Sequence, residues 1–173
     1  NIAYTMKLLG TDPIIVGAIG TDADDYLKHF KKQDISTKYI SVSKQFMSAS
    51  AYITTDKDDN QITAFYPGAG GEGIESAVDE IKEKILVTLI SPTKKETMIE
   101  HSKQAYEKNI PIMFDPGQQI TALNPRELSM LIGQAKILIA NDYEMKLIES
   151  KTGWGEKELF DHVEVVITTL GEK

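Results

Sequence analysis

The segment that decides the fold covers residues 85–114 and reads ILVTLISPTKKETMIEHSKQAYEKNIPIMF. Its two ends, 85–90 and 112–114, are almost continuous apolar runs. Such runs, without polar alternation, indicate strands that are covered on both faces. Between them, residues 94–108 repeat apolar and small side chains with the 3.6-residue period of a helix. A strand, a helix and a second strand form a βαβ crossover, so we predict a parallel sheet.

The same alternation of strands and helices extends along the rest of the chain. Further apolar runs occupy residues 14–19, 137–140 and 163–168. We expect helices at about 2–9, 22–33, 125–134 and 142–150. Strands that alternate with helices in this way predict an α/β fold of the doubly wound type, with a mainly parallel sheet and helices on both faces.

Residues 37–66 have a different pattern. Apolar and polar side chains alternate over 51–55 and over 62–66, on either side of the polar turn 56–60. Alternation of this kind predicts an antiparallel hairpin with one wetter face. The hairpin can be an ordinary sheet edge, or it can belong to a small antiparallel β-lid over the carboxyl ends of the parallel strands, where open α/β sheets bind ligands. Both interpretations stay open.

The composition restricts the class of protein. With 173 residues, 41% of them hydrophobic and 26% charged, the chain can bury one ordinary core. It has no cysteine, which excludes disulfides and thiolate zinc sites, and its three histidines lack metal-ligand spacing. A net charge of −7 argues against a nucleic-acid surface. No run approaches the roughly eighteen apolar residues of a membrane span, so we expect a cytoplasmic protein without nucleic-acid or membrane partners.

Asn1 begins the first predicted helix and is followed by two glycines in the spacing N-x-A-x(6)-G-x(9)-G. Gly10 can take the left-handed conformation that ends a helix, and Gly20 ends the first apolar strand. The amide of Asn1 can cap the helix. It can equally offer paired donor and acceptor groups to a hydroxylated ligand. The local sequence is compatible with both roles.

Five further polar or small residues follow predicted strands, at the edge of the sheet where ligands bind. They are Asp115, Asn141, Glu144, Thr169 and Gly171. Each has a local structural interpretation: a turn-forming Asp, a capping box of Asn141 with Glu144, and an ordinary strand end. The carboxylates also suit Mg²⁺, which prefers oxygen ligands and keeps several waters.

Together these motifs resemble the ribokinase-like (PfkB) family of carbohydrate and nucleoside kinases. The resemblance rests on the Asn-Gly-Gly spacing of residues 1–20, the N-x-x-E of 141–144 and the T-x-G of 169–171, in family order and over nearly the whole chain. It implies a ribokinase-like α/β domain over residues 1–173, with 37–66 as the lid-like segment. The first strand of the family and its C-terminal catalytic segment are expected outside this sequence.

The resemblance implies an ATP-dependent phosphotransferase that transfers the γ-phosphate to a primary hydroxyl of a nucleoside or sugar. In such kinases Asn1 and Gly20 would bind the acceptor. Asn141, Thr169 and Gly171 would contact the nucleotide.

The resemblance also implies a Mg²⁺ site that involves Glu144 and Asp115. The longer sugar-kinase pattern of Asp followed by Asn and Arg is missing, because Gln118 and Gln119 follow instead. The catalytic Asp of the family belongs to a Gly-Ala-Gly-Asp element expected beyond Lys173. We therefore expect residues 1–173 alone to transfer phosphate poorly or not at all.

The acceptor is expected to be a nucleoside, because residues 51–56, 60–62 and 65–69 are most similar to adenosine-kinase-like members of the family. A ribokinase- or fructokinase-type sugar kinase is the alternative within the family. A non-catalytic protein that binds a nucleoside or sugar on the same scaffold is the alternative outside catalysis. An edge hairpin can also pair between subunits, which makes a homodimer one of the expected assemblies.

Overall fold

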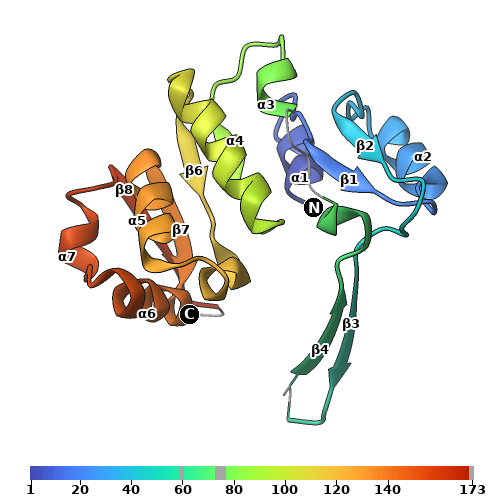
Figure 1. Ribbon diagram of the computed structural model, residues 1–173. Coiled ribbons are helices and arrows are strands. Elements are labelled where there is room, and N and C mark those ends of the chain that lie inside the picture. The colour runs from blue at the N-terminus through green and yellow to red at the C-terminus, as the bar shows by residue number, and fades with distance from the viewer. Residues whose placement is uncertain (59–60, 73–76, 172–173) are drawn as a thin grey trace. The chain divides into compact units, whose positions relative to one another are not determined.

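The computed structural model describes residues 1–58, 61–72 and 77–171. The chain divides into two compact units, Asn1–Ala77 and Val78–Lys173. Each unit contains its own helices and strands (Figure 1), and each is described by itself.

The first unit begins with a helix and a parallel pair of strands. α1 (Ile2–Leu8) precedes β1 (Gly17–Ile19), and α2 (Asp24–Lys32) leads from β1 to β2 (Ile40–Val42). β1 and β2 pair in parallel, as a βαβ unit requires. Of the predicted strand at 14–19, only the last three residues form β1. β2 lies inside the segment predicted as lid-like, yet it pairs with β1 and not with the hairpin.

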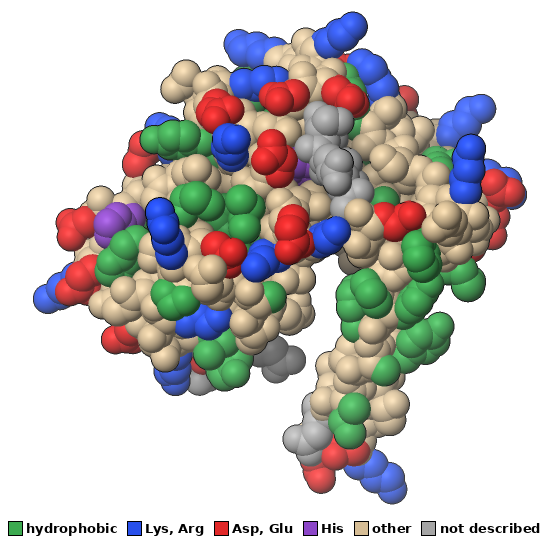
Figure 2. Space-filling view, in the orientation of Figure 1, with side chains coloured by type: hydrophobic (Ala, Val, Ile, Leu, Met, Phe, Trp, Pro, Cys, Tyr) green, Lys and Arg blue, Asp and Glu red, His purple; other side chains and the backbone are tan. Residues whose placement is uncertain are grey.

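The antiparallel hairpin is confirmed. β3 (Ser50–Thr55) pairs with β4 (Gln61–Tyr66) over the full length of both strands. Residues 59 and 60 of the predicted turn lie outside the described residues. Apolar side chains are exposed on both faces: Ile62 is 79% exposed on one face, and Phe65 is 66% exposed on the other. The prediction of a single wetter face is therefore wrong, because no element of this unit covers either face within the part that the structure describes. Figure 2 shows hydrophobic side chains along the side of the hairpin that faces the viewer.

The second unit contains the parallel sheet that the apolar runs predict. Its strands are β5 (Thr88–Ile90), β6 (Ile112–Phe114), β7 (Ile137–Asn141) and β8 (Val165–Thr169), all parallel and hydrogen-bonded in that order. The predicted run 85–90 is a strand only in its second half. The α/β class is thus confirmed.

Three crossover helices join these strands. α4 (Lys95–Glu107), α5 (Pro125–Gln134) and α6 (Asp142–Thr152) each lead from one strand to its neighbour. Strand order follows chain order and crossovers are right-handed, so the three helices lie on one face of the sheet. On that face α4 contacts α5, and α5 contacts α6. The shorter helices of the chain are η1 (Gly68–Gly71), α3 (Ala77–Glu80), η2 (Gly117–Thr121) and α7 (Glu156–Leu159). None of the helices in the described ranges combines the length and hydrophobicity needed to cross a membrane.

The core of this unit lies between the sheet and its helices. Phe114 and Leu138 of the central strands are fully buried, as is Leu131 of α5. Burial alternates along β7, whereas most of β8 is exposed, with Val165 at 43%. The expectation of strands covered on both faces is therefore wrong for β8, because it is the last strand in the order of this sheet and the helices of the unit cover one face.

Candidate functional site

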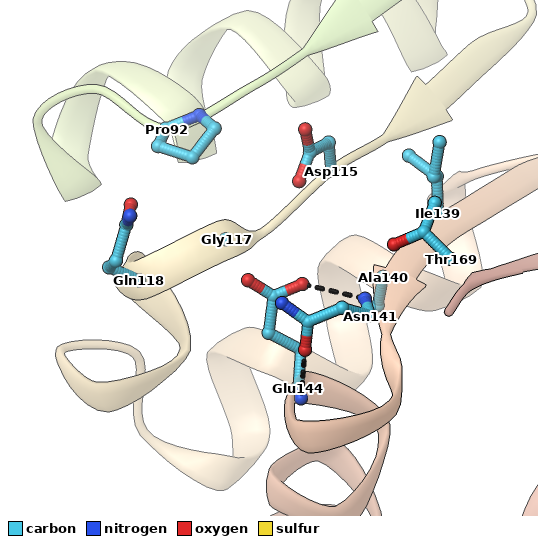
Figure 3. A pocket seen from close by; sticks show the side chains of 9 residues that line it. All are labelled: Pro92, Asp115, Gly117, Gln118, Ile139, Ala140, Asn141, Glu144 and Thr169. Carbon is cyan, nitrogen blue, oxygen red and sulfur yellow. Dashed lines mark hydrogen bonds between the residues drawn. The ribbon is translucent and has the colours of Figure 1, made fainter. Parts of the chain in front are cut away.

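A pocket of about 330 Å³ lies at the carboxyl ends of the parallel strands in the second unit (Figure 3). Every strand of the sheet contributes to it: Pro92 follows β5, Asp115 follows β6, Asn141 ends β7 and Thr169 ends β8. The remaining lining residues are Gly117, Gln118, Ile139, Ala140 and Glu144. Ligands of open α/β sheets bind at this edge. The pocket thus brings together four of the predicted site residues of this unit, Glu144 included.

Asn141 and Glu144 form the capping box of α6. The backbone N–H of Glu144 donates to Asn141 Oδ1 at 2.8 Å, and the backbone N–H of Asn141 donates to Glu144 Oε2 at 2.8 Å. The second oxygen of the Glu144 carboxylate has no hydrogen-bond partner among the described residues. The box therefore fixes the Glu144 side chain while leaving one oxygen for a ligand, so the capping role and the ligand role are compatible.

The chain forms a second capping box of the same kind at the start of α5. There the N–H of Glu127 donates to Asn124 Oδ1 at 2.9 Å, and the N–H of Asn124 donates to Glu127 Oε2 at 2.8 Å. Glu127 also accepts a hydrogen bond from Lys95 Nζ at 3.2 Å. Neither Asn124 nor Glu127 lines the pocket. The N-x-x-E spacing alone therefore does not identify a ligand site, and position after a strand of the sheet does.

Asp115 faces Glu144 across the pocket (Figure 3). Burial raises the pKa of Asp115 above its ordinary value of 3.8, the charge of Glu144 raises that pKa further, and the N–H of Gly117 partly offsets both by donating to the carboxylate. Desolvation and a nearby like charge both disfavour an ionised carboxyl group. A cation between the two carboxylates would remove this repulsion, so the donor set fits a hard divalent ion.

The described residues contain no cluster of three or more His, Cys, Asp or Glu side chains of the kind that holds a metal ion by itself. A Mg²⁺ ion held by Asp115 and Glu144 would need water or phosphate oxygens for the rest of its shell. That is the usual coordination of Mg²⁺ beside bound phosphates.

Gly117 shapes the wall of the pocket next to Asp115. Its φ of +46° is in the left-handed region, and a Cβ at this position would overlap Cγ of Pro92. Only glycine combines that backbone conformation with that close approach. Gln118, a departure from the sugar-kinase pattern, follows and lines the pocket.

Thr169 and Gly171 close β8. Thr169 is the last residue of the strand, pairs with Asn141 of β7 and lines the pocket. Gly171 follows at a φ of +67° and is not among the lining residues. The structure therefore separates the two residues of the T-x-G motif: the threonine belongs to the pocket, and the glycine belongs to the turn that leaves it.

Asn1 and Gly20 belong to the first unit. Asn1 occupies the N-cap position of α1, but its side chain makes no capping hydrogen bond. Its backbone carbonyl accepts the N–H of Thr5 at 2.9 Å. Gly10 has the predicted left-handed conformation, with a φ of +82°. The side-chain cap is thus not found, and the exposed amide of Asn1 keeps its donor and acceptor groups.

Gly20 is held in a tight hydrogen-bonded turn. Its N–H donates to Ser48 Oγ at 2.9 Å, and Ser48 donates to Asp22 Oδ1 from its hydroxyl at 2.7 Å and from its backbone at 2.8 Å. These bonds, from the backbone N–H of Ser48 first, lower the pKa of Asp22. A Cβ at Gly20 would overlap backbone atoms of Met47 and Ser48. Close approach of two backbones therefore requires glycine here.

Sequence reasoning missed several residues of these sites, among them Pro92, Asp22, Gln118 and Ser48. Pro92 could have been found from its position after an apolar run, the signal that identified Asp115. Asp22 follows the strand-ending Gly20 by two residues, and Gln118 follows Asp115 by three. Ser48 gave no signal, because it reaches Gly20 from 28 residues away.

Comparison with known proteins gives consistent matches over the whole chain. The family model of the pfkB family carbohydrate kinases matches residues 1–173. A nucleoside kinase of Methanocaldococcus jannaschii is 27% identical over 175 residues, which cover 100% of this chain and 57% of that protein. The solved structure of this nucleoside kinase, described as an archaeal member of the ribokinase family, matches with a TM-score of 0.86 at 26% identity and covers 99% of this chain and 57% of that chain.

The nucleoside kinase of Burkholderia thailandensis is similar in sequence and in fold. Its structure in complex with inosine matches with a TM-score of 0.93 at 37% identity, over 99% of this chain and 56% of that chain. Its structure in complex with ADP-inosine matches with a TM-score of 0.90 at 38% identity, over 99% of this chain and 54% of that chain. These matches confirm the predicted ribokinase-like fold. The chain spans little more than half the length of these relatives.

Proposed function

Since this chain belongs to the pfkB family of carbohydrate kinases, we propose that it is part of an ATP-dependent kinase that transfers the γ-phosphate to a primary hydroxyl of a nucleoside. The observation that carries the proposal is the pocket in which Asp115, Asn141, Glu144 and Thr169 meet at the carboxyl ends of parallel strands. Similar proteins from two organisms are nucleoside kinases, and one of them binds inosine, which favours a nucleoside over a sugar as acceptor.

The pocket is assigned to the phosphates of the nucleotide. Asn141 and Thr169 would contact the nucleotide from the ends of β7 and β8, with Gly171 in the turn that follows. Glu144 and Asp115 would hold Mg²⁺, whose contribution is to neutralise phosphate charge during transfer. The residues of this chain supply orientation, because the capping box holds Glu144 and the Gly117 turn holds Asp115.

The acceptor is assigned to the first unit. The amide of Asn1, which makes no side-chain cap bond, can donate to one hydroxyl and accept from another. The backbone of Gly20, fixed by Ser48, would lie next to the same acceptor. Deprotonation of the acceptor hydroxyl is assigned to an Asp outside residues 1–173, in the Gly-Ala-Gly-Asp element that the family resemblance implies.

A thermal-shift panel tests the function and separates its alternatives. The protein that carries residues 1–173 is heated with inosine, adenosine, ribose or fructose, with and without ATP and Mg²⁺. A ligand at about 100 times its Kd stabilises the folded state by about 2.7 kcal/mol. We expect stabilisation by a nucleoside and by Mg-ATP. Stabilisation by ribose or fructose alone would instead identify a sugar kinase.

A phosphotransfer assay with the same compounds separates an enzyme from a binding protein. Radiolabelled γ-phosphate should appear on the nucleoside. Nucleoside binding without any transfer by the whole protein would favour the non-catalytic alternative.

The hairpin is assigned to contact between two copies of the protein, in a cytoplasmic homodimer. Tyr52 and Ile62 are 68% and 79% exposed on one face, and Ile53 and Phe65 are 57% and 66% exposed on the other. Exposed apolar surface of this kind marks interaction sites, and the outer edges of both strands can pair with another chain. Light scattering tests the assignment: Ile62→Lys should convert a dimer to a monomer, and a wild-type monomer would refute it.

A further inference from the structure

Lys151 lies in the last turn of α6, the helix whose first turn carries Glu144. Its Nζ donates to three backbone carbonyl oxygens, those of Ile120 at 2.6 Å, Leu123 at 2.6 Å and Thr121 at 3.1 Å. An ammonium group has three donors and no acceptor. The three carbonyls therefore satisfy the whole donor capacity of this side chain.

These carbonyls belong to the end of η2 and to the turn that follows it. The last carbonyls of a helix lack partners within it and carry partial negative charge. Hydrogen bonds from a charged donor are shorter and stronger than neutral ones. Ile120 and Leu123 are themselves fully buried, whereas Thr121 is exposed, so a replacement that cannot donate would leave the carbonyls of two buried residues without this partner.

The two elements that Lys151 joins form two sides of the pocket. η2 begins at Gly117, directly after Asp115 and Pro116, and Gly117 and Gln118 line the pocket. α6 begins after Asn141 and presents Glu144 to the same space. η2 and α6 are in direct contact. Lys151 thus links the supports of the two opposed carboxylates through charge-assisted hydrogen bonds.

We propose that Lys151 is a positioning residue, which holds η2 against α6 and so sets the separation of Asp115 and Glu144. The inference rests on the proposed function, because it concerns the pocket that would hold Mg²⁺ and the nucleotide phosphates. Lys151 itself does not line the pocket. Its effect is on geometry: without the link, the two carboxylates are no longer held at one spacing, and Mg²⁺ demands a near-ideal octahedral arrangement of its ligands.

The test compares Lys151→Met with Lys146→Met in the protein that carries residues 1–173. Both variants remove one positive charge from α6 and keep a long apolar side chain. Lys146 is exposed, no hydrogen bond or ion pair within the described residues involves it, and it is nearer than Lys151 to Glu144 in the sequence. Lys146→Met therefore controls for the loss of one positive charge from this helix.

Calorimetry measures the Mg²⁺ dependence of ATP binding, at a temperature well below the unfolding midpoint of every variant. Loss of a residue that orients metal ligands costs about 10- to 100-fold in metal affinity. We expect Lys151→Met to raise the Mg²⁺ concentration for half-maximal ATP binding by about 10-fold or more, with nucleoside affinity unchanged. Lys146→Met should match the wild type. Lys151→Arg should recover part of the loss, because guanidinium keeps the charge and several donors.

The outcomes separate this inference from the proposed function. Mg²⁺-dependent ATP binding that is equal in Lys151→Met and wild type overturns the positioning role, even if the variant has a lower unfolding midpoint. Absence of Mg²⁺-dependent ATP binding in the wild type overturns it as well. A third outcome is that Mg-ATP binding depends on Lys151 but the protein transfers phosphate to no nucleoside or sugar. That outcome refutes the proposed function and leaves the positioning role supported.

Discussion

Replacement of Glu144 by Gln separates the two roles of this side chain. Glutamine can complete a capping box as glutamate does, so the hydrogen bond from the N–H of Asn141 should survive. Loss of a negative charge from the first turn of α6 costs a few tenths of a kcal/mol. Removal of the repulsion with Asp115 returns a similar amount, since partly exposed charge pairs contribute about 0.2 to 1 kcal/mol. The ligand-free variant should therefore unfold within about 0.5 kcal/mol of wild type.

The effect on ligand binding should be much larger. If Glu144 is one of two carboxylates that hold Mg²⁺, its neutralisation should lower the affinity for Mg-ATP by at least about tenfold, which is about 1.4 kcal/mol. The extra stability that saturating Mg-ATP gives the wild type should fall by that amount. Urea unfolding at neutral pH, with and without Mg-ATP, measures both quantities in one series.

Glu127→Gln is the matched control, since Glu127 occupies the same position in the capping box of α5. This variant loses the ion pair with Lys95, whose Nζ lies 3.2 Å from Glu127 Oε1. It should be destabilised without ligand, because this ion pair is lost, yet gain as much stability from Mg-ATP as the wild type. An equal Mg-ATP response in Glu144→Gln and Glu127→Gln would refute the assignment of the pocket.

Three further predictions concern single residues. Asp115→Asn should raise the free energy of unfolding at neutral pH by a few tenths of a kcal/mol. The reason is that burial and the charge of Glu144 raise the pKa of Asp115 in the folded state. The folded state therefore binds the proton more tightly than the unfolded state, and ionisation of Asp115 at neutral pH destabilises the fold. The stability that this proton gives is complete below pH 3.8 and is lost as pH rises through the pKa of the folded state. In urea titrations the difference in free energy of unfolding between the variant and the wild type should therefore shrink toward pH 4. A difference that stays constant with pH would contradict the linkage. Gly20→Ala should cost about 1 to 3 kcal/mol, because the new Cβ overlaps the backbone of Met47. Gly133→Ala in α5, where a Cβ meets nothing within 4 Å, should stabilise by about 0.5 to 1 kcal/mol. Thermal unfolding compares the two variants, and a Gly20→Ala protein as stable as wild type would show that the predicted clash is absent.

Most of the fold could be predicted because its signals are local. The apolar runs that became β6 and β7 were found almost to the residue, as was the helical period of α4. β8 was predicted from the same type of run, but its exposure was not. Burial depends on which elements pack on a strand, and a run of apolar side chains looks the same in a central strand as in the last strand of a sheet.

The candidate site was only partly predictable. Asp115 and Thr169 were identified because they follow apolar runs, and parallel strands place their carboxyl ends at one edge. Ser48 and Lys151 were not identified, because each acts on residues about thirty positions away, Gly20 and the carbonyl of Ile120 respectively. No spacing within a short motif reports contacts of that separation.

The capping boxes show where sequence information ends. Asn124 with Glu127 and Asn141 with Glu144 are specified by four consecutive residues each, because their hydrogen bonds span only three positions. The amino-acid sequence therefore determines that both helices are capped. Only the tertiary structure decides that the box of Asn141 with Glu144 faces a pocket, because that requires the ends of β6, β7 and β8 to meet. Strand pairing over long separations brings them together.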